Sequence, residues 1–129
     1  MRALLDTSVF IARAQGRPLG EHPTEVAVSV VTISELRYGV LAADDHTPRA
    51  IRLSTLEAAR RIGSPLVIDE PVADELARLR VALKAAGRAM KGMDAWIAAT
   101  AMRHKVAVCT QDADFDAACE TGLLEVVRV

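Results

Sequence analysis

The sequence predicts one α/β domain in which helices cover both faces of a central parallel sheet of about five strands. The chain has 129 residues, and 51% of them are hydrophobic, which suits a single compact core. Short β-rich runs alternate along it with stretches of helical character. Two of these runs are continuously apolar, which is typical of strands buried on both faces of a parallel sheet. We therefore expect one domain spanning residues 1–129.

The predicted strands are short aliphatic runs bounded by polar residues or by glycine and proline. They cover residues 2–5, 26–31, 66–68, 106–110 and 124–128. The second and fourth of them are the continuously apolar runs that favour a parallel sheet. Breakers such as Gly16-Arg17-Pro18 and Gly63-Ser64-Pro65 separate these strands from the helices.

Helical stretches fill the sequence between the strands. They cover residues 7–15, 33–43, 48–62, 71–86 and 94–104. The clearest is the fourth, where apolar residues recur at helical spacing and mark one buried face: Val72, Leu76, Leu79 and Leu83.

Composition limits the classes of function that fit. Sixteen basic and 17 acidic residues give a formal net charge of -1, so any affinity for nucleic acid must be local. Asp6 interrupts the first apolar run too early for a signal peptide, and no later run approaches a membrane-spanning length. We expect a soluble cytoplasmic protein with no membrane partner. Cys109 and Cys119 are too few for a disulfide scaffold and lack metal-ligand spacing, so we interpret them as ordinary thiols.

Acidic residues follow the ends of the predicted strands. Asp6 ends the first strand, and Glu35 lies a few residues after the second. Asp94 opens a helix, and Asp112 and Asp114 follow the fourth strand. Because the carboxyl ends of parallel strands form the ligand-binding edge of an α/β sheet, acids from distant segments are expected to meet there. The sequence thus predicts one acidic pocket.

Each acid also has a purely structural interpretation. Asp6 is placed to cap the helix that follows it, and Thr32-Ile33-Ser34-Glu35 fits a capping box. Asp94 and Asp112 lie near helix starts, where a negative charge gains roughly 0.3 to 1 kcal/mol from the helix dipole. For any one acid, capping is the stronger explanation. It does not explain why acids from four segments should converge on one edge.

Converging carboxylates require a cation. Two carboxylates about 5 Å apart repel each other by roughly 3 kcal/mol at an effective dielectric near 20. A divalent ion removes this cost, and oxygen ligands without histidine or cysteine favour magnesium or manganese over zinc. His22, His46 and His104 lack ligand spacing and are expected at the surface.

Four ordered segments resemble the motifs of the PIN-domain family. Residues 4–9, L-L-D-T-S-V, are similar to its N-terminal signature, and residues 29–39, S-V-V-T-I-S-E-L-R-Y-G, resemble the segment that carries its glutamate. Residues 87–101 resemble the family's G-R-x(5)-D-x-x-I-A-A-x-A segment, and residues 108–115 its closing T-x-N/D-x-D-F stretch. The match spans the chain, and its length and motif form are most similar to VapC-type toxins. The resemblance implies a PIN-like fold.

The resemblance also implies roles for the residues at matching positions. Asp6, Glu35 and Asp94 match the invariant acidic core, with Asp112 as the fourth catalytic acid and metal ligand. Either acid of the last motif can face the metal in the family, so Asp114 is the second choice. The candidates for contact with the substrate are Thr7, Ser8, Thr110, Arg88 and Lys91. The three hydroxyls suit turns and caps equally well, and the two basic residues suit simple solvation.

The implied function is that of the toxin of a type II toxin–antitoxin system. Such a toxin is an endoribonuclease in which one or two Mg²⁺ ions, or Mn²⁺, bind the scissile phosphate and activate water, leaving 5′-phosphate ends. The implied partners are RNA, a second copy of the chain, and a VapB-like antitoxin whose C-terminal segment crosses a groove near the acidic pocket. Excess apolar residues in the segments 33–43 and 48–62 agree with such interfaces. The sequence does not indicate which RNA is cut.

Three other functions fit part of the pattern. A phosphoacceptor receiver domain also clusters aspartates, but it needs an acidic pair after its first strand, and here Thr7 follows Asp6. A non-catalytic PIN-like module that acts only with a DNA-binding partner would not need an intact set of acids. A metal-dependent DNA nuclease of related architecture usually has additional helices, for which this chain is short. RNA cleavage is the preferred hypothesis.

Overall fold

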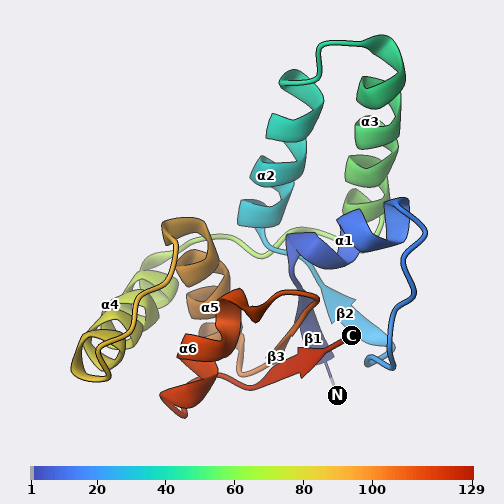
Figure 1. Cartoon of the computed structure of the whole chain (residues 1–129). Coiled ribbons are helices and arrows are strands. Elements are labelled where there is room, and N and C mark those ends of the chain that lie inside the picture. The colour runs from blue at the N-terminus through green and yellow to red at the C-terminus, as the bar shows by residue number, and fades with distance from the viewer. Residues whose placement is uncertain (1) are drawn as a thin grey trace.

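A four-stranded parallel sheet forms the centre of the protein, as the computed structural model of residues 2–129 shows (Figure 1). The strands lie in the order β2-β1-β3-β4. In the central pair, Leu4 lies opposite Val108. The bounds of the strands are β1 (Arg2–Leu5), β2 (Glu25–Ala27), β3 (Ala107–Thr110) and β4 (Val126–Arg128).

Six α-helices accompany the sheet within the described residues 2–129. Figure 1 shows α2 and α3 rising together as a hairpin on one side, with α4 and α5 on the other. A 3-10 turn, Ala113–Phe115, precedes the last helix. The bounds of the helices are α1 (Thr7–Ala14), α2 (Val30–Leu41), α3 (His46–Arg60), α4 (Glu70–Ala85), α5 (Gly92–His104) and α6 (Asp116–Glu120).

Alternate residues of the central strands point into two separate cores. Leu4 and Val108 pack into one core with buried side chains of α4, α5 and α6, among them Leu79. Leu5 and Cys109 pack into the other core with side chains of α1, α2 and α3. Side chains of successive strand residues point to opposite faces, so both faces of the sheet are buried. This confirms the expected doubly covered parallel sheet.

The apolar stripe of α4 is buried as predicted. Val72, Leu79 and Leu83 are buried, and Leu76 is half-buried. No helix among residues 2–129 is long and apolar enough to cross a membrane.

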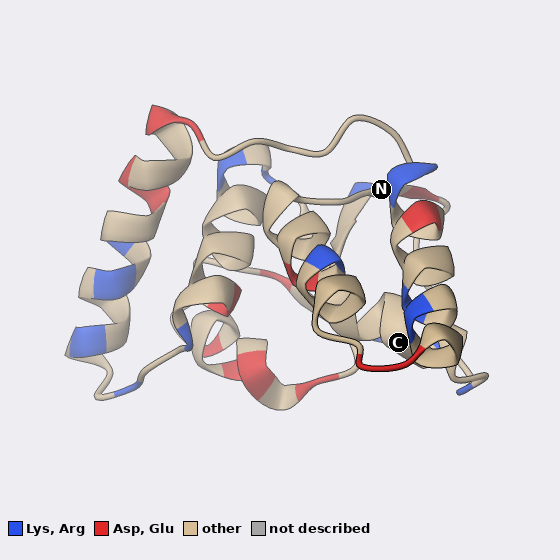
Figure 2. Ribbon diagram, turned by 90° about the horizontal axis from the view of Figure 1, so that it is seen from above, with Lys and Arg blue, Asp and Glu red and all other residues tan. Residues whose placement is uncertain are grey.

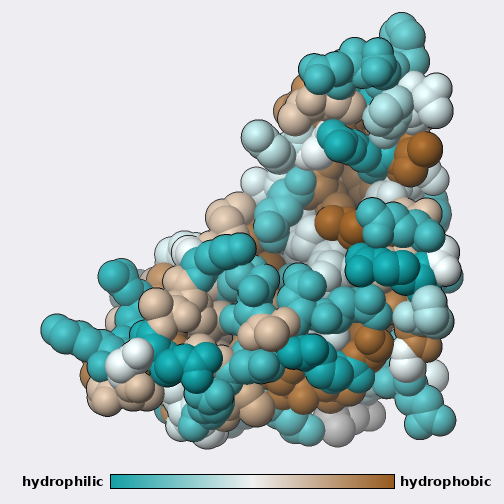
Figure 3. All heavy atoms as spheres, in the orientation of Figure 1, coloured by the Kyte–Doolittle hydropathy of each residue, from teal (hydrophilic) through white to brown (hydrophobic). Residues whose placement is uncertain are grey.

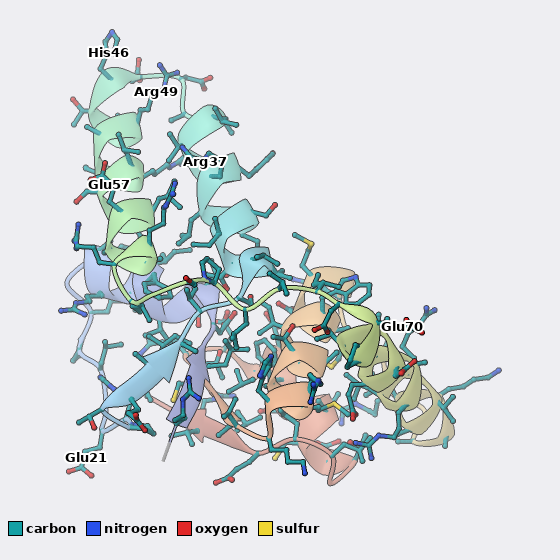
Figure 4. All side chains as sticks on the ribbon, turned by 180° about the vertical axis from the view of Figure 1, so that it is seen from behind. Glu21, Arg37, His46, Arg49, Glu57 and Glu70 are labelled. Atoms are coloured by element: carbon teal, nitrogen blue, oxygen red, sulfur yellow. The ribbon has the colours of Figure 1, made fainter. Side chains whose placement is uncertain are left out.

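The three histidines are exposed, as expected. Figure 4 shows His46 at the outer tip of the α2–α3 hairpin. Near this tip, the guanidinium of Arg49 donates a hydrogen bond to the carbonyl of Ala43 at 2.6 Å. Arg52, also on α3, donates to the carbonyl of Gly39 at 2.8 Å. These bonds join the end of α2 to α3 and so stabilise this helical arm, residues 30–60.

The second strand is shorter than the sequence predicts. It ends at Ala27 rather than at residue 31, and α2 begins at Val30 rather than at residue 33. The cause is Ser29, whose hydroxyl accepts a hydrogen bond from the backbone N–H of Thr32 at 3.2 Å and so caps the helix. The expected capping box at residues 32–35 is therefore wrong, because Thr32 lies buried inside the helix.

The expected third strand at residues 66–68 is also wrong, and the sheet has four strands rather than five. Leu66 forms a single parallel bridge with Ser29, in which the Leu66 N–H donates to the carbonyl of Val28 at 2.8 Å. The bridge cannot extend because the neighbouring chain turns into α2 at Val30. The β-branched residues that suggested a strand, Val67 and Ile68, remain 58% and 41% exposed.

Candidate active site

A pocket of about 400 Å³ opens at the carboxyl ends of β1 and β3, between α1, α2 and the start of α5. It brings together the five acids that the sequence singled out, although they come from four separate segments of the chain. The residues that line it are Asp6, Thr7, Ser8, Ile11, Arg17, Glu35, Lys91, Gly92, Met93, Asp94, Asp112 and Asp114.

Asp6 forms the base of the pocket. It is 3% exposed, and its position at the end of β1 makes it the N-cap of α1. One carboxylate oxygen, Oδ1, accepts a hydrogen bond from the Thr7 N–H at 2.7 Å. The other, Oδ2, accepts from the hydroxyls of Ser8 at 2.8 Å and Thr110 at 2.9 Å. Asp6 thus caps a helix and faces the pocket at once, so its two interpretations are compatible.

Glu35 is held by a hydroxyl from a different helix. The Thr7 hydroxyl donates a hydrogen bond to Glu35 Oε1 at 2.7 Å and thereby joins the first turn of α1 to α2. Because the backbone N–H of Thr7 also donates a hydrogen bond to Asp6, one residue orients two of the acids.

The loop after β3 is attached to the same network. Ser8 Oγ accepts a hydrogen bond from the Gln111 N–H at 3.0 Å, and Thr110 Oγ1 accepts one from the Asp112 N–H at 3.0 Å. The hydroxyls that bind Asp6 therefore also fix the backbone that carries Asp112 and Asp114. Both of these aspartates are exposed at the rim of the pocket.

Burial and mutual repulsion raise the pKa of the inner acids. Burial is the main cause of the raised pKa of Asp6, and its hydrogen bonds to Ser8 and Thr110 oppose the change. Burial also raises the pKa of Glu35, with a contribution from the charge of Asp6. The pKa of Asp94 rises to about 6 through burial and the charges of Asp6, Asp114 and Glu35, against the opposing charge of Lys91. Burial is thus the main cause in all three acids, and repulsion adds to it at Glu35 and Asp94.

The chemistry of the pocket suits a hard divalent cation held partly through water. No three acidic, histidine or cysteine side chains of residues 2–129 are close enough together to enclose an ion by themselves. Magnesium commonly binds through one or two carboxylates and keeps several of its waters. Such an ion would offset the repulsion that raises the pKa of Asp94.

The other predicted contact residues divide into two groups. Thr7, Ser8 and Lys91 line the pocket. Thr110 does not line it, but its hydroxyl donates a hydrogen bond to Asp6. Arg88 does not line it and forms an ion pair with Glu120 of α6.

Four lining residues were not predicted from the sequence as site residues: Ile11, Arg17, Gly92 and Met93. Arg17 was assigned only to a chain break, in the Gly16-Arg17-Pro18 segment. Since α1 has only eight residues, the loop that follows it stays close to Asp6 at the start of the helix. The shortness of this helix is the signal that could have identified Arg17.

A buried aspartate at the end of a parallel strand, with a glutamate and further aspartates around one pocket, defines an α/β protein with an acidic site suited to a divalent cation. The chain belongs to the PIN-domain family, because residues 3–120 match the profile of the PIN domain.

Two curated relatives resemble nearly the whole chain. Ribonuclease VapC5 of Mycobacterium tuberculosis is 46% identical over 128 residues, which cover 98% of this chain and 94% of that protein. Ribonuclease VapC4 of the same organism is 44% identical over 127 residues and covers 97% of each chain.

The crystal structure of VapBC-5, a member of the VapBC family of toxin–antitoxin systems from Mycobacterium tuberculosis, has a chain with the same fold. The two chains superimpose with a TM-score of 0.90 at 44% identity, over 99% of this chain and 98% of the other. The expected PIN-like fold is confirmed.

The raised pKa of Asp94 predicts a stability change that depends on pH. In the metal-free protein, Asp94→Asn should raise the melting temperature at about pH 8, because it removes a charge that burial and repulsion disfavour. The pKa of Asp94 in the folded protein, about 6, exceeds its ordinary value of 3.8, so the wild type loses stability as pH rises between these values. The gain should therefore vanish near pH 3.

Thermal unfolding of both proteins in EDTA at these two pH values measures the effect. Asp74→Asn on the exposed surface of α4 is the matched control and should change little. Equal melting temperatures of Asp94→Asn and the wild type at about pH 8 would show that the charge of Asp94 does not destabilise the fold.

Proposed function

We propose that the protein is a VapC-type toxin, an endoribonuclease of a type II toxin–antitoxin system that acts in the cytoplasm and uses Mg²⁺ in its acidic pocket. The observation that carries the proposal is the convergence of Asp6, Glu35 and Asp94 on one pocket, in which hydrogen bonds orient Asp6 and Glu35. Relatives that match the chain from end to end are named ribonucleases, which supports RNA as the substrate.

The proposed metal ligands are Asp6, Glu35 and Asp94. Neighbouring hydroxyl groups orient the first two of them. Asp6 lines the pocket and is oriented by hydrogen bonds from Thr7, Ser8 and Thr110. Glu35 is oriented by Thr7. A Mg²⁺ ion bound there would supply a water of lowered pKa and neutralise charge on the scissile phosphate. Mn²⁺ has the same ligand preference.

Two cations at the rim are suited to the RNA backbone. Lys91 and Arg17 both line the pocket and are exposed. Their charges would draw a phosphate toward the acids, which would otherwise repel it. No histidine lines the pocket within the described residues, so a histidine acid–base pair acting through the RNA 2′-hydroxyl has no support there. Hydrolysis by an activated water, with 5′-phosphate products, is the mechanism that fits.

The alternatives differ from this proposal in the substrate or in the need for chemistry. A metal-dependent DNA nuclease would use the same acids, whereas a PIN-like binding module would not need them. The pocket retains every acid and the hydroxyls that orient them, which favours a catalytic role over binding alone. RNA and single-stranded DNA offered to the same preparation separate the two nucleases.

Replacing Asp94 tests the proposed chemistry. Asp94→Asn should lower RNA cleavage by more than about 100-fold, since even outer partners of metal ligands contribute about 10- to 100-fold to activity. Cleavage of total cellular RNA with and without EDTA measures the loss, and mapping of the product ends identifies the phosphate. The control is Asp74→Asn, which should cut like the wild type. Full activity of Asp94→Asn in magnesium, or of the wild type in EDTA, would refute the role of Asp94 as a metal ligand.

The pocket favours a different fourth metal ligand from the one that the sequence favours. From the sequence, Asp112 ranks ahead of Asp114. In the pocket, however, the charge of Asp114 contributes to the raised pKa of Asp94, and Asp112 is not among the causes. Coulomb energy falls with distance, so Asp114 has the stronger electrostatic coupling to Asp94. We propose Asp114 as the fourth ligand.

Asp114→Asn should therefore reduce cleavage more than Asp112→Asn does. Both variants remove one exposed negative charge from the same loop, so each serves as the control of the other. Initial cleavage rates over a range of Mg²⁺ concentrations measure the effect, and the Asp114 variant should need more Mg²⁺ for half-maximal activity. A larger loss for Asp112→Asn would restore the order expected from the sequence.

A second hollow beside the acidic pocket is the proposed site of the antitoxin. It measures about 550 Å³, lies between α1, α2 and α3, and shares Thr7, Ile11 and Glu35 with the acidic pocket. Figure 3 shows hydrophobic atoms in the hollow of the helical arm. Tyr38 is 74% exposed and Ile51 is 55% exposed along its walls. An antitoxin segment with apolar residues would fill it, and a basic residue of that segment would meet Glu35.

Tyr38→Glu should weaken antitoxin binding by about tenfold or more, because it places a charge where an aromatic contact would be buried. It should leave RNA cleavage by the isolated toxin unchanged, since Tyr38 does not line the acidic pocket. Titration with the product of the adjacent antitoxin gene measures the affinity. Unchanged affinity would exclude this groove.

The protein is also proposed to form a homodimer, as the resemblance to VapC-type toxins implies. Sedimentation of the toxin alone tests this, and a strict monomer at high concentration would exclude the dimer.

A further inference from the structure

A separate hollow of about 610 Å³ lies between α4, α5 and the segment that joins them. Its walls are apolar toward the core and basic toward the rim, and no acidic residue lines it. The apolar residues include Leu76, Met90 and Trp96, and the basic ones are Arg80, Lys84 and Arg88.

Two of the three basic residues are available to a ligand. Arg80 and Lys84 are exposed and form no ion pair within residues 2–129, whereas Arg88 is paired with Glu120. Figure 2 shows that α4, at the left of the view, carries acidic residues at one end and basic residues at the other. The hollow adjoins the basic end. This is a local positive charge on a chain whose net charge is -1.

Trp96 gives the hollow an aromatic wall. It is the only tryptophan of the chain, it is half-buried, and it packs against the core beside Met90. An aromatic ring fixed at a partly open site can stack on a nucleic-acid base, and nearby cations can hold the adjoining phosphates. This combination suits an unpaired nucleotide.

The hollow and the acidic pocket meet at Gly92. This residue lines both of them, and a Cβ atom added to it would meet no heavy atom within 4 Å. The surface is therefore open at the point where a strand would pass from one to the other. Lys91, on the acidic side, and Arg88, on the other, continue the basic residues across this junction.

We propose that this hollow binds the single-stranded RNA that flanks the cleaved bond, with a base stacked on Trp96 and phosphates held by Arg80 and Lys84. The inference rests on the proposed ribonuclease function, because it requires RNA in the acidic pocket. A second copy of the chain fits the hollow less well. Two-fold dimers bring the same surface of both subunits together, which would set these cations against their own copies.

The single tryptophan makes the site directly observable. A short single-stranded RNA of random sequence, added to the Asp94→Asn variant, should quench the fluorescence of Trp96 through base stacking. Inorganic polyphosphate carries the charge without the bases and should leave the emission unchanged. Wild-type protein in EDTA provides the same measurement without relying on the folding of the variant.

Two arginines of α4, Arg80 and Arg78, allow a test variant and a matched control in an RNA-cleavage assay. Arg80→Gln and Lys84→Gln should each raise KM for RNA by roughly threefold to tenfold and leave kcat unchanged, because a lost phosphate contact weakens binding only. Arg78→Gln removes the same charge from the same helix, but Arg78 is paired with Glu75 and does not line the hollow. It should leave both constants unchanged.

The outcomes separate this inference from the proposed function. If the wild type cleaves RNA but RNA leaves Trp96 emission unchanged, or Arg78→Gln raises KM as much as Arg80→Gln does, the RNA subsite is overturned and the ribonuclease stands. Emission that changes with protein concentration and not with RNA would assign the hollow to self-association and would also overturn it. If RNA quenches Trp96 but no RNA is cut, the binding site stands and the ribonuclease function fails.

Discussion

A buried carboxylate at the end of the first strand is the constraint on which the rest of the site depends. Asp6 loses most of its hydration in the fold, and an ionised carboxylate in such a place is costly unless hydrogen bonds replace the lost water. Three donors do so: the Thr7 N–H and the hydroxyls of Ser8 and Thr110. Its own N–H donates to the carbonyl of Cys109 on β3 at 2.9 Å. These hydrogen bonds of Asp6 therefore fix the start of α1 relative to the end of β3.

The two cores of the protein bring the remaining acids to Asp6 from opposite faces of the sheet. Glu35 belongs to α2, whose Leu36 and Val40 pack into the same core as α1 and α3. Asp94 belongs to α5, whose Ile97 and Ala98 pack into the core shared with α4 and α6. Burial and repulsion between the acids, which together raise the pKa of Asp94, act against this convergence. The packing of both cores holds like charges together, as a site for a divalent cation requires.

The fold and the site could be predicted from the sequence where local chemistry and long-range order agree. The alternation of strands and helices predicts the covered sheet, and acids at strand ends predict the pocket, because both follow from the direction of parallel strands. The prediction failed at residues 66–68 and at the start of α2, where the Ser29 cap overrides the β-branched residues around it. It also missed Arg17 and the hollow beside Trp96, since these depend on how a loop and two helices pack rather than on any motif.

The wall between the acidic pocket and the proposed antitoxin groove has an evolutionary consequence. Thr7, Ile11 and Glu35 line both hollows, and the hydrogen bond from Thr7 to Glu35 lies within that wall. A mutation there that escaped an inhibitor would also disturb Glu35, a proposed metal ligand. Mutations that change inhibitor specificity are then confined to the outer side of the groove, at residues such as Tyr38 and Ile51. Related toxin–antitoxin pairs in one cell would diverge in recognition there while their catalytic centres stayed alike.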